Sequence, residues 1–445
     1  MPIRLLPGKL AGVFTRPALV SIFLLINAFV WYSYAIVLLQ ESIEGLHLDF
    51  LSNMLVWGTH FGALILSAIL GASLTKTMGG RTRFLAIWVL IGTVSSLAPF
   101  VLNTAETWGT ITLGLIFGFS LGFGMPNCMG YFTHQTPVEN RGRIGGLVFV
   151  LTGLLIVVLD IVGINGTLAL ATTLVILRGV SLLAIPFVKA PVEIEQSYKP
   201  PSYRNMLSQR PFVLYFVPWI MFSLLNYLTT PVQQNVLDAT IFSNMQMLQN
   251  VFIAIFALVG GVFMDKVGRK RMAIIGFVLQ GLSFSFVGFS RDPSVWYFHS
   301  IMNGVSWGIL CVLFVMTIWG DLSHEVASDK FYALGVSPFF VSKMLQVIIN
   351  AEIVRAIDVT AIFSFSALFL FLAVLPLIYA PETLPEKIMK DRELKNYIEK
   401  AKKEVSKAHE NQGENKQCEN EKDTVEFEVN PEDEEKVQEL AEKYY

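Results

Sequence analysis

The sequence predicts an all-α membrane protein of twelve transmembrane helices, arranged in two parallel halves of six helices each. Three observations support this prediction. The chain of 445 residues is 53% hydrophobic and only 15% charged, its apolar residues fall into long runs, and its basic residues gather on alternate connections. A soluble domain usually carries about 25% charged residues. The composition therefore argues against an ordinary soluble protein.

Twelve apolar runs are long enough to cross a bilayer, because a hydrocarbon core of ~30 Å needs about 20 helical residues. Helices are expected because backbone polar groups in lipid must be satisfied within the segment. The runs cover residues 18–40, 53–75, 84–102, 107–131, 143–163, 167–188, 212–231, 239–264, 272–289, 296–319, 333–354 and 359–380.

The placement of Lys and Arg supports this helix count. With the N-terminus in the cytoplasm, seventeen basic residues fall in inner connections, and only Arg291 and Arg355 fall in outer ones. Cytoplasmic loops of membrane proteins carry such an excess of positive residues. We therefore expect a multi-pass protein of the cell membrane with both termini in the cytoplasm.

The chain repeats itself, which is a feature of many transporter folds. Three pairs of similar segments recur in the same order after 194, 188 and 190 residues. The pairs are Arg16-Pro17 with Arg210-Pro211, Gly80–Arg83 with Gly268–Arg271, and Ile185–Glu193 with Leu375–Thr383. Because each half has an even number of helices, the two halves should share one orientation.

The repeat and the charge pattern divide the chain into four parts. Residues 1–188 are expected to form one six-helix bundle and residues 212–384 the other, with a cytoplasmic linker at 189–211. Residues 385–445 are expected to form a charged cytoplasmic tail, helical at first and then disordered. The last 36 residues, from Glu410, hold thirteen acidic residues and four lysines, a composition typical of disorder.

The clearest motif runs from Gly261 to Arg271 and reads Gly-Val-Phe-Met-Asp-Lys-Val-Gly-Arg-Lys-Arg. It resembles the inner-loop signature of the major facilitator superfamily, G-x-x-x-D-[RK]-x-G-R-[RK]-[RK]. The earlier copy, Gly71 to Arg83, has one extra residue, and Thr75 stands in place of the Asp. The resemblance covers about residues 12–385 and implies a transporter of the alternating-access type.

In that family, the inner-loop cluster locks the outward-facing state. The resemblance implies that Asp265 faces the start of the fifth helix near 142–146, that Arg269 pairs with Glu139, and that Arg81 or Arg83 reaches Asp321 or Glu325. The alternative is that these cations only set the topology. The candidate gating residues are Gly71, Lys76, Gly80, Arg81, Arg83, Glu139, Arg141, Gly261, Asp265, Lys266, Gly268, Arg269, Lys270, Arg271 and Asp321.

The resemblance also implies that helices 1, 4, 7 and 10 line a central cavity, flanked by helices 2, 5, 8 and 11. Amide and aromatic side chains on these helices are suited to a polar organic ligand, although such groups also hold transmembrane helices together. The candidate substrate-binding residues are Asn27, Trp31, Tyr34, Asn226, Tyr227, Gln246, Asn250, Asn303, Trp307, Lys343, Gln346 and Asn350.

Ionisable residues inside apolar runs are costly and are usually paired or functional. Lys343 lies near the middle of the eleventh run and could hold an anionic substrate or pair with a carboxylate. Asp160 and Glu352 lie near outer helix ends and are candidates for proton coupling. Arg178 is expected to snorkel toward the interface or to be structural, and His60 is expected to be a packing donor rather than a proton relay.

The sequence holds no nucleophile–base set, no phosphate-binding loop and no spacing typical of a metal or disulfide site. We therefore expect no enzyme, cofactor or metal, and no nucleic-acid partner.

The predicted function is secondary active or facilitative transport of a small organic solute by a monomer, with H⁺ or Na⁺ as candidate coupling ions and an anion or polyol as the preferred substrate. The alternatives are a multidrug/proton antiporter, a transporter-like sensor and a membrane-embedded enzyme. The antiporter is disfavoured because Leu113–Tyr131 lacks the Arg, and Leu147–Val162 the Gly-Pro-rich stretch, that many such exporters carry.

Overall fold

The computed structural model describes residues 15–75, 78, 80–188, 201–290, 292–324, 327–349, 351–356 and 358–385, and leaves the side chains of residues 351 and 352 undescribed. Packing divides the chain into two compact units, Met1–Pro385 and Glu386–Tyr445. All described residues belong to the first unit. The predicted tail at 385–445 lies outside the described residues except for Pro385.

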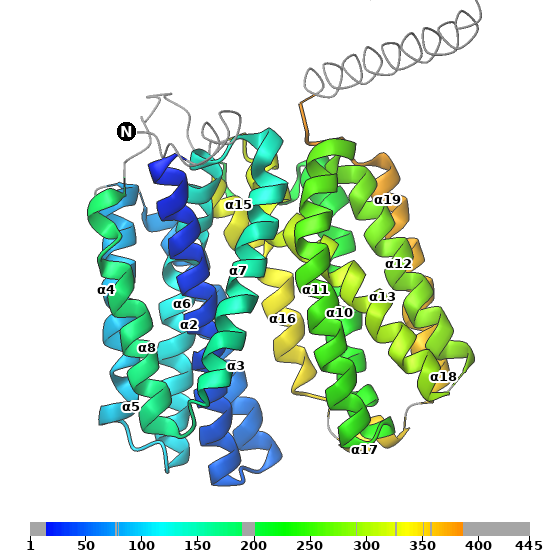
Figure 1. Ribbon diagram of the computed structural model, residues 1–445, viewed down its shortest axis with the longest axis horizontal. Helices are drawn as coiled ribbons and strands as arrows, with labels where there is room; N and C mark the ends of the chain where they lie inside the picture. The colour runs from blue at the N-terminus through cyan, green and yellow to red at the C-terminus, as the bar shows by residue number, and fades with distance from the viewer. Residues whose placement is uncertain are drawn as a thin grey trace, which may run out of the picture. The chain divides into compact units, whose positions relative to one another are not determined.

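The first unit is built from helices (Figure 1). In the described part of the chain, eleven helical stretches are long and apolar enough to cross a membrane. The α-helices are α2 (Arg16–Leu46), α3 (Phe50–Leu74), α4 (Arg81–Ser96), α5 (Ala98–Val101), α6 (Thr107–Gln135), α7 (Arg141–Val162), α8 (Thr167–Leu182), α9 (Tyr203–Leu207), α10 (Arg210–Val236), α11 (Ala239–Val267), α12 (Arg269–Phe289), α13 (Pro293–Cys311), α14 (Ile318–Leu322), α15 (Ser328–Gly335), α16 (Ser337–Gln346), α17 (Ala351–Ala356), α18 (Val359–Leu372) and α19 (Val374–Tyr379). The other helical segments are the 3₁₀ turns η1 (Val138–Asn140) and η2 (Ile185–Phe187) and the π-helix η3 (Val312–Thr317).

Local sequence explains where the first helix of each half begins. The Thr15 hydroxyl accepts a hydrogen bond from the Ala18 N–H at 3.3 Å, and Pro17 occupies the first turn of α2. Pro211 occupies the same position in α10. Proline suits a first turn because its φ is already helical and the missing N–H would have had no partner there. The prediction that Arg16-Pro17 and Arg210-Pro211 open helices is confirmed.

The predicted eleventh run, 333–354, is the one that is not among the eleven spanning stretches found in the described part of the chain. It is divided into α15, α16 and α17, and α16 has only 10 residues. The first interruption lies at Val336, two residues before Pro338 in the first turn of α16. Proline disfavours helical continuation through its lack of an N–H and its ring, which explains the break.

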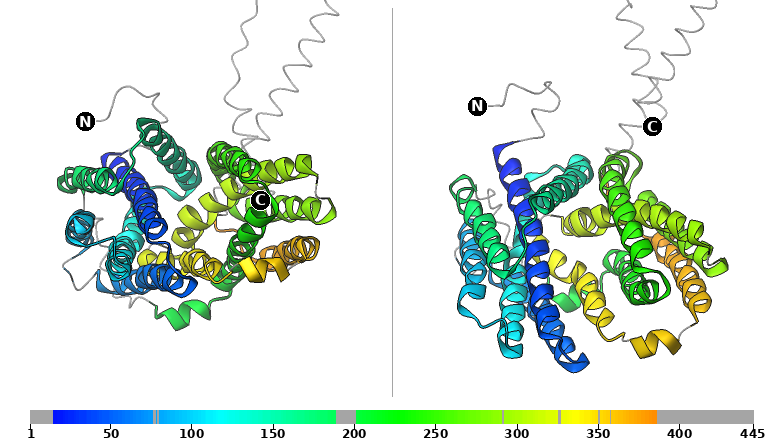
Figure 2. Two further views of the ribbon diagram at one scale, coloured as in Figure 1. Left: turned by 90° about the horizontal axis from the view of Figure 1, so that it is seen from below. Right: turned by 60° about the horizontal axis from the view of Figure 1, so that its bottom comes forward.

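Within each half, neighbouring helices pack side by side (Figure 2). In the first half, α6 packs on α2, α3 and α4, and α8 packs on α2 and α4. In the second half, α12 packs on α13 and α18, while α10 packs on α16.

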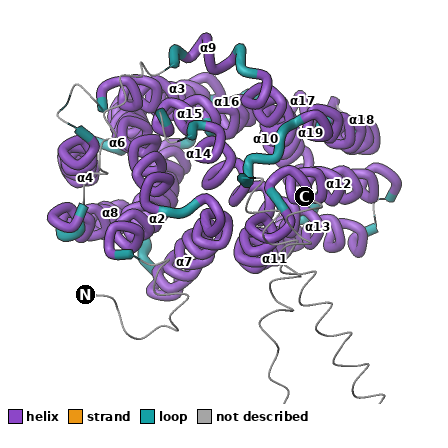
Figure 3. The backbone as a smooth tube through the Cα atoms, turned by 90° about the horizontal axis from the view of Figure 1, so that it is seen from above, coloured by secondary structure: helices purple, strands orange, loops and turns teal. Residues whose placement is uncertain are grey.

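Three sets of helices join the two halves. Helix α7 packs on α11 and η3, α15 packs on α3 and α6, and α16 packs on α3. Figure 3 shows α15 beside α3 and α6. The site described next lies along these contacts.

Many large apolar side chains remain exposed on the outer helix faces, including Leu66, Val101, Ile161 and Phe289. Contiguous apolar surface on this scale is unusual for a soluble protein. It is the surface expected of helices that contact lipid.

Candidate functional site

The second copy of the inner-loop motif joins α11 to α12 through Gly268, whose φ of +113° lies in a region that L side chains rarely adopt. Asp265, at the end of α11, is fully buried. Its carboxylate accepts hydrogen bonds from the Gly142 N–H at 2.9 Å and the Arg143 N–H at 2.8 Å. These amides lie in the first turn of α7, where the helix dipole favours an anion. Asp265 therefore meets the start of the fifth spanning helix, as the motif implies.

Two buried arginines complete a cluster around two buried aspartates. The Arg269 guanidinium donates to Asp265 at 2.7 Å and to Asp321 at 3.1 Å. Arg141 pairs with Asp321 as well and donates to the Thr133 carbonyl at 2.8 Å. We refer to Arg141, Asp265, Arg269 and Asp321 as the charge cluster. Its formal charges balance, so none of these four buried ions lacks an opposite charge, a deficit that is costly for a buried ion pair.

The predicted partner of Arg269 is wrong. Arg269 uses its nitrogens on Asp265, Asp321 and the Val138 carbonyl, the last at 2.7 Å. We expected Glu139, which directly follows Val138. Arg269 does reach this turn through the Val138 carbonyl, but the carboxylates that pair with it are those of Asp265 and Asp321.

Glu382, in the Pro-Glu-Thr segment after α19, caps the start of α12. Its carboxylate accepts from the Arg269 N–H at 2.8 Å and the Lys270 N–H at 3.1 Å. Thr383 donates to Asp321 at 3.2 Å. The segment that closes the second half therefore takes part in the same network, which the sequence pattern alone did not indicate.

The first copy of the motif uses a different arrangement. Thr75 donates to the Gly71 carbonyl at 3.2 Å and does not carry the charge that Asp265 carries. Arg81, at the start of α4, pairs with Asp329 in the first turn of α15 at 2.6 Å. The predicted partners of Arg81 were Asp321 and Glu325. Asp321 belongs to the charge cluster, and Glu325 lies outside the described residues.

The repeat could have identified Asp329. Arg269 follows Arg81 by 188 residues, and Asp329 follows Glu139 by 190. The expected pair of Arg269 with Glu139 is therefore formed by the equivalent residues of the other half. Both cross-half connections lie where the basic connections of the sequence converge, at the end assigned to the cytoplasm.

The remaining motif residues are glycines at helix crossings or turns, and basic residues. Gly71 and Gly261 lie at close helix crossings, where an added Cβ would come within 1.8 Å of the Phe123 carbonyl oxygen and 2.3 Å of the Gly142 carbonyl oxygen. Gly80 has a φ of +92°. Arg83, Lys266 and Arg271 are exposed, Lys270 donates to the Ile378 carbonyl at 2.7 Å, and Lys76 lies outside the described residues.

A cavity of about 440 Å³ lies along the contact between the halves. Its walls come from α2, α3, α6, α7, the junction of α13 with η3, α15 and α16, and they are mostly apolar. Among the described residues that line it, Lys343 is the only charged side chain. The lining residues are Phe29, Tyr32, Ser33, Ile36, Leu64, Ile65, Ala68, Leu121, Gly122, Met125, Pro126, Met129, Phe149, Thr152, Cys311, Val315, Tyr332, Ala333, Val336, Ser337, Phe339, Phe340 and Lys343.

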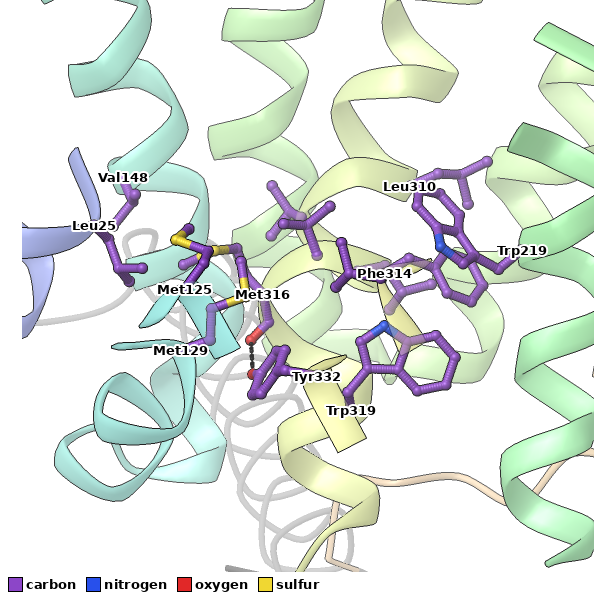
Figure 4. Close-up of a cluster of buried hydrophobic side chains, with 14 of the residues drawn as sticks. Leu25, Met125, Met129, Val148, Trp219, Leu310, Phe314, Met316, Trp319 and Tyr332 are labelled. Carbon is purple, nitrogen blue, oxygen red and sulfur yellow. Dashed lines mark hydrogen bonds between the residues drawn. The ribbon is translucent and has the colours of Figure 1, made fainter. Parts of the chain in front are cut away.

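The π-helix η3 shapes one wall of this cavity. Such segments are rare and are frequent at functional sites. Figure 4 shows Met125 and Met129 of α6 near Met316 of η3, with the Tyr332 hydroxyl donating to the Met316 carbonyl at 2.6 Å. Tyr332 also contacts the Thr133 hydroxyl at 3.0 Å and so joins α15, α6 and η3.

Of the predicted substrate-binding residues, Lys343 lines the cavity. On α2 the predicted face was Asn27, Trp31 and Tyr34, but these side chains are buried within the first half. Asn27 donates to the Leu177 carbonyl at 2.6 Å, and the Trp31 indole donates to Ser96 at 2.8 Å. The adjacent face, with Tyr32 and Ser33, meets the cavity instead.

In the second half, the predicted amides form a packing network. The Gln280 amide donates to Asn226 at 2.8 Å and to Asn303 at 2.7 Å, and the Trp307 indole donates to Asn226 at 3.0 Å. The network lies among α10, α12 and α13. It corresponds to the alternative that these amides hold helices together.

The other predicted residues are dispersed. Tyr227 lies beside the cavity, with its ring centroid 5.8 Å from the Lys343 amine. Gln246 and Gln346 are half-buried and do not line the cavity, and Asn250 is exposed. Asn350 and the side chain of Glu352 lie outside the described residues. Asp160 is exposed at the end of α7 and accepts from the Tyr34 hydroxyl at 2.6 Å.

Arg178 is fully buried in the first half, between the rings of Trp31 and Trp88 at 4.9 and 4.3 Å. None of its three guanidinium nitrogens has a hydrogen-bond partner within the described structure. Contact with two aromatic faces partly offsets the cost of burying its charge. This arrangement is consistent with the structural role that we expected.

Comparisons with known proteins give a family match and a solved structure of similar fold. Residues 161–409 match the family described as Major Facilitator Superfamily. The crystal structure of the human organic anion transporter MFSD10 (TETRAN) superposes with a TM-score of 0.61 at 13% sequence identity, over 84% of this chain and 100% of that one. No curated protein matches the sequence. At this identity, the superposition supports the fold alone.

Proposed function

The chain belongs to the major facilitator superfamily, and on that premise we propose that it carries a small organic anion across the cell membrane by alternating access. The family and the transporter neighbour support membrane transport of a solute rather than catalysis. The nature of the solute follows from the cavity.

The observation that carries the proposal is the position of Lys343. It is the one charged residue among the described residues around an otherwise mostly apolar cavity. A charge in such surroundings is costly unless it meets a partner or water. An anion with an aromatic or aliphatic body would supply the partner charge and fill the apolar walls. The printed name of the structural neighbour, an organic anion transporter, agrees with this substrate class.

The charge cluster and the Arg81–Asp329 pair are suited to act as the inner gate. The charge cluster joins α7 to α11 and α14, and the Arg81–Asp329 pair joins α4 to α15. Both therefore connect the two halves. Opening toward the cytoplasm would separate these ions, so the cluster stabilises the state in which the inner side is closed. Rocking of the two halves about the cavity then exposes Lys343 to one side at a time.

A multidrug exporter for organic cations is a poorer fit. Lys343 would repel a cationic substrate, and no carboxylate is found among the described residues that line the cavity. A neutral polyol remains the second substrate class, because Tyr32, Ser33 and Thr152 offer hydroxyl groups there. We further propose a monomer with both termini in the cytoplasm and H⁺ or Na⁺ as the coupling ion.

The proposal predicts that purified protein is stabilised by organic anions through Lys343. Naphthalene-2-sulfonate and octanoate should raise the thermal unfolding temperature, whereas naphthalene-2-methanol and a cationic drug should not. Lys343→Gln should weaken the sulfonate effect at least about tenfold in half-saturating concentration, because one charge-assisted contact contributes roughly 1.5–3 kcal/mol.

Lys330→Gln is the matched control, because Lys330 lies on the neighbouring helix α15 and its amine contacts the Pro201 carbonyl outside the cavity. It should respond to sulfonate as the unmodified protein does. If the anions stabilise Lys343→Gln and the unmodified protein equally, the anion site is elsewhere and the proposal is wrong.

A further inference from the structure

Behind the cavity wall lies a buried histidine with one defined tautomer. His60 of α3 is fully buried. Its Nδ1 lies 2.9 Å from the Gly114 carbonyl oxygen, which can only accept, so Nδ1 carries a proton. Its Nε2 lies 3.1 Å from the Tyr32 hydroxyl. Neutral His60 therefore accepts at Nε2 and is able to bind one more proton there.

Tyr32 connects this histidine to the cavity. Its side chain lines the cavity together with Lys343. Trp57 and Phe61 pack against the imidazole, which leaves the Tyr32 hydroxyl as the hydrogen-bonded route from His60 to the cavity in the described structure. His60 is thus closed off from solvent but one hydroxyl group away from the substrate site.

The groups that face His60 from each neighbouring helix are few. Helix α2 contributes the Tyr32 hydroxyl and α6 contributes the Gly114 carbonyl, while Lys343 of α16 lines the cavity together with Tyr32. In the described structure, none of the hydrogen-bond or ring contacts of His60 is with a carboxylate. A second positive charge on His60 would be repelled by Lys343 until an anion binds there.

From this geometry we propose that His60 is the proton-binding residue of the transport cycle and that Tyr32 relays its proton, so that the protein moves an organic anion together with H⁺. This rests on the proposed function, because Lys343 must bind the anion. His60 takes the place of Asp160 and Glu352 as the coupling candidate, which revises the expectation that it is only a packing donor, and the transport becomes a symport.

The proton step leaves the tyrosine unchanged. A hydronium ion in the cavity gives a proton to the Tyr32 oxygen and becomes water, while the Tyr32 O–H bond breaks and its proton binds Nε2 of His60. Tyr32 ends neutral, and His60 ends as an imidazolium that donates back to the Tyr32 oxygen. Release into the cytoplasm reverses the same transfer once the cavity opens there.

Charge couples the two ligands. An anion on Lys343 offsets the repulsion that opposes a proton on His60, and a proton on His60 strengthens anion binding by the same factor, because linkage is reciprocal. Couplings of this kind typically amount to about 5- to 150-fold in affinity. When the anion and the proton are both bound, their charges cancel. The net charge at the site is then the single positive charge of Lys343.

The chain offers a matched control in His299 of α13. It is equally buried, and its ring nitrogens contact Ser283 at 2.7 Å and Gln233 at 3.4 Å. It does not line the cavity and lies within the second half. His299→Gln therefore tests whether any buried histidine would give the same result.

The experiment uses naphthalene-2-sulfonate, which neither titrates near neutral pH nor crosses lipid as a neutral acid. Purified full-length protein in a weakly buffered solution with a pH indicator should take up protons when sulfonate binds, as a fraction of one proton for each sulfonate, in a range of pH set by His60. In proteoliposomes, an inward proton gradient should drive sulfonate accumulation.

His60→Gln should still bind sulfonate and exchange it across the vesicle, but proton uptake and gradient-driven accumulation should fall at least about fivefold. His299→Gln should behave as the unmodified protein. If His60→Gln is not monodisperse after purification, Tyr32→Phe decides instead, since it removes the relay hydroxyl and should lower gradient-driven accumulation at least about fivefold more than it lowers sulfonate affinity.

Two failures are distinguishable. If sulfonate binds and is exchanged, but binding takes up no proton or His60→Gln keeps gradient-driven accumulation, the proton role is wrong and the anion transport stands. If the unmodified protein binds neither sulfonate nor octanoate, the proposed function and the proton role are both wrong.

Discussion

At the scale of single residues, the protein places its buried charges in two different ways. Asp265 and Asp321 have zero or near-zero exposure and are matched by Arg141 and Arg269, with additional amide donors on Asp265. Lys343 and Arg178 have no carboxylate partner in the described structure. Arg178 is enclosed by aromatic rings, whereas Lys343 faces a cavity. The charges that are paired with one another therefore form the gate. Lys343, which faces the cavity without a carboxylate partner, is available to bind the substrate.

Asp321→Asn should weaken the closed inner gate more than any surface charge change. The substitution leaves Arg141 and Arg269 buried with one negative charge too few, and breaking a buried pair in this way costs about 3–5 kcal/mol. We expect a lower thermal unfolding temperature together with higher reactivity of a cysteine probe at Val138 on the inner side.

Glu44→Gln is a suitable control, since Glu44 is exposed at the end of α2 and its carboxylate accepts a hydrogen bond from the Gln40 amide at 2.9 Å, away from the charge cluster. Exposed contacts of this kind contribute roughly 1 kcal/mol or less. Equal stability losses in the two variants would show that the cluster does not hold the gate.

At the scale of helices, the sequence predicts element positions well and helix rotation poorly. The Arg-Pro starts of α2 and α10 and the position of Asp265 at α7 could be predicted, because they depend on local geometry and on a motif. The cavity face of α2 could not, because polar side chains in a membrane find partners within their own half, as Trp31 does with Ser96. Because the cavity is mostly apolar, choosing polar residues as candidates selected residues that pack helices together, not residues that line the cavity.

The close crossing of α7 and α11 depends on small residues. A Cβ on Gly146 would lie 2.3 Å from the Ala257 carbonyl oxygen, whereas a Cβ on Gly153 of the same helix would meet nothing within 4 Å. Gly146→Ala should therefore separate the two helices near the charge cluster, and we expect slower transport and reduced protection of the inner end from cysteine reagents.

Gly153→Ala serves as the matched control. Replacing glycine with alanine in an open helix position stabilises it by up to about 1 kcal/mol, so this variant should unfold at the same or a higher temperature and transport normally. If Gly146→Ala also gains stability and keeps its transport rate, the crossing is not tightly packed in the membrane.

At the scale of the whole molecule, duplication accounts for both gate connections. The Arg269 region and the Arg81 region are related by the repeat, yet they connect the halves differently. Arg269 pairs with Asp265 and Asp321 of its own half and donates to the Val138 carbonyl of the other half, whereas Arg81 pairs directly with Asp329 of the other half. Thr75 thus stands where the second copy has an aspartate, and Asp329 on the facing helix supplies the carboxylate for this connection. Two halves of like orientation can close the same side with different pairs, provided that each pair joins one half to the other.

This orientation can be tested with engineered cysteines in a Cys311→Ser, Cys418→Ser background, in which Cys128 remains buried. Arg83→Cys and Lys266→Cys lie at exposed positions in the two motif copies, and Glu106→Cys lies in a connection at the other end of its half. Because seventeen of the nineteen loop cations fall on the side assigned to the cytoplasm, a membrane-impermeant maleimide should label Glu106→Cys in intact cells. Arg83→Cys and Lys266→Cys should both react only after the membrane is opened. Labelling of these two from opposite sides would mean that the halves are inverted, in which case the charge cluster and the Arg81–Asp329 pair could not close one common face.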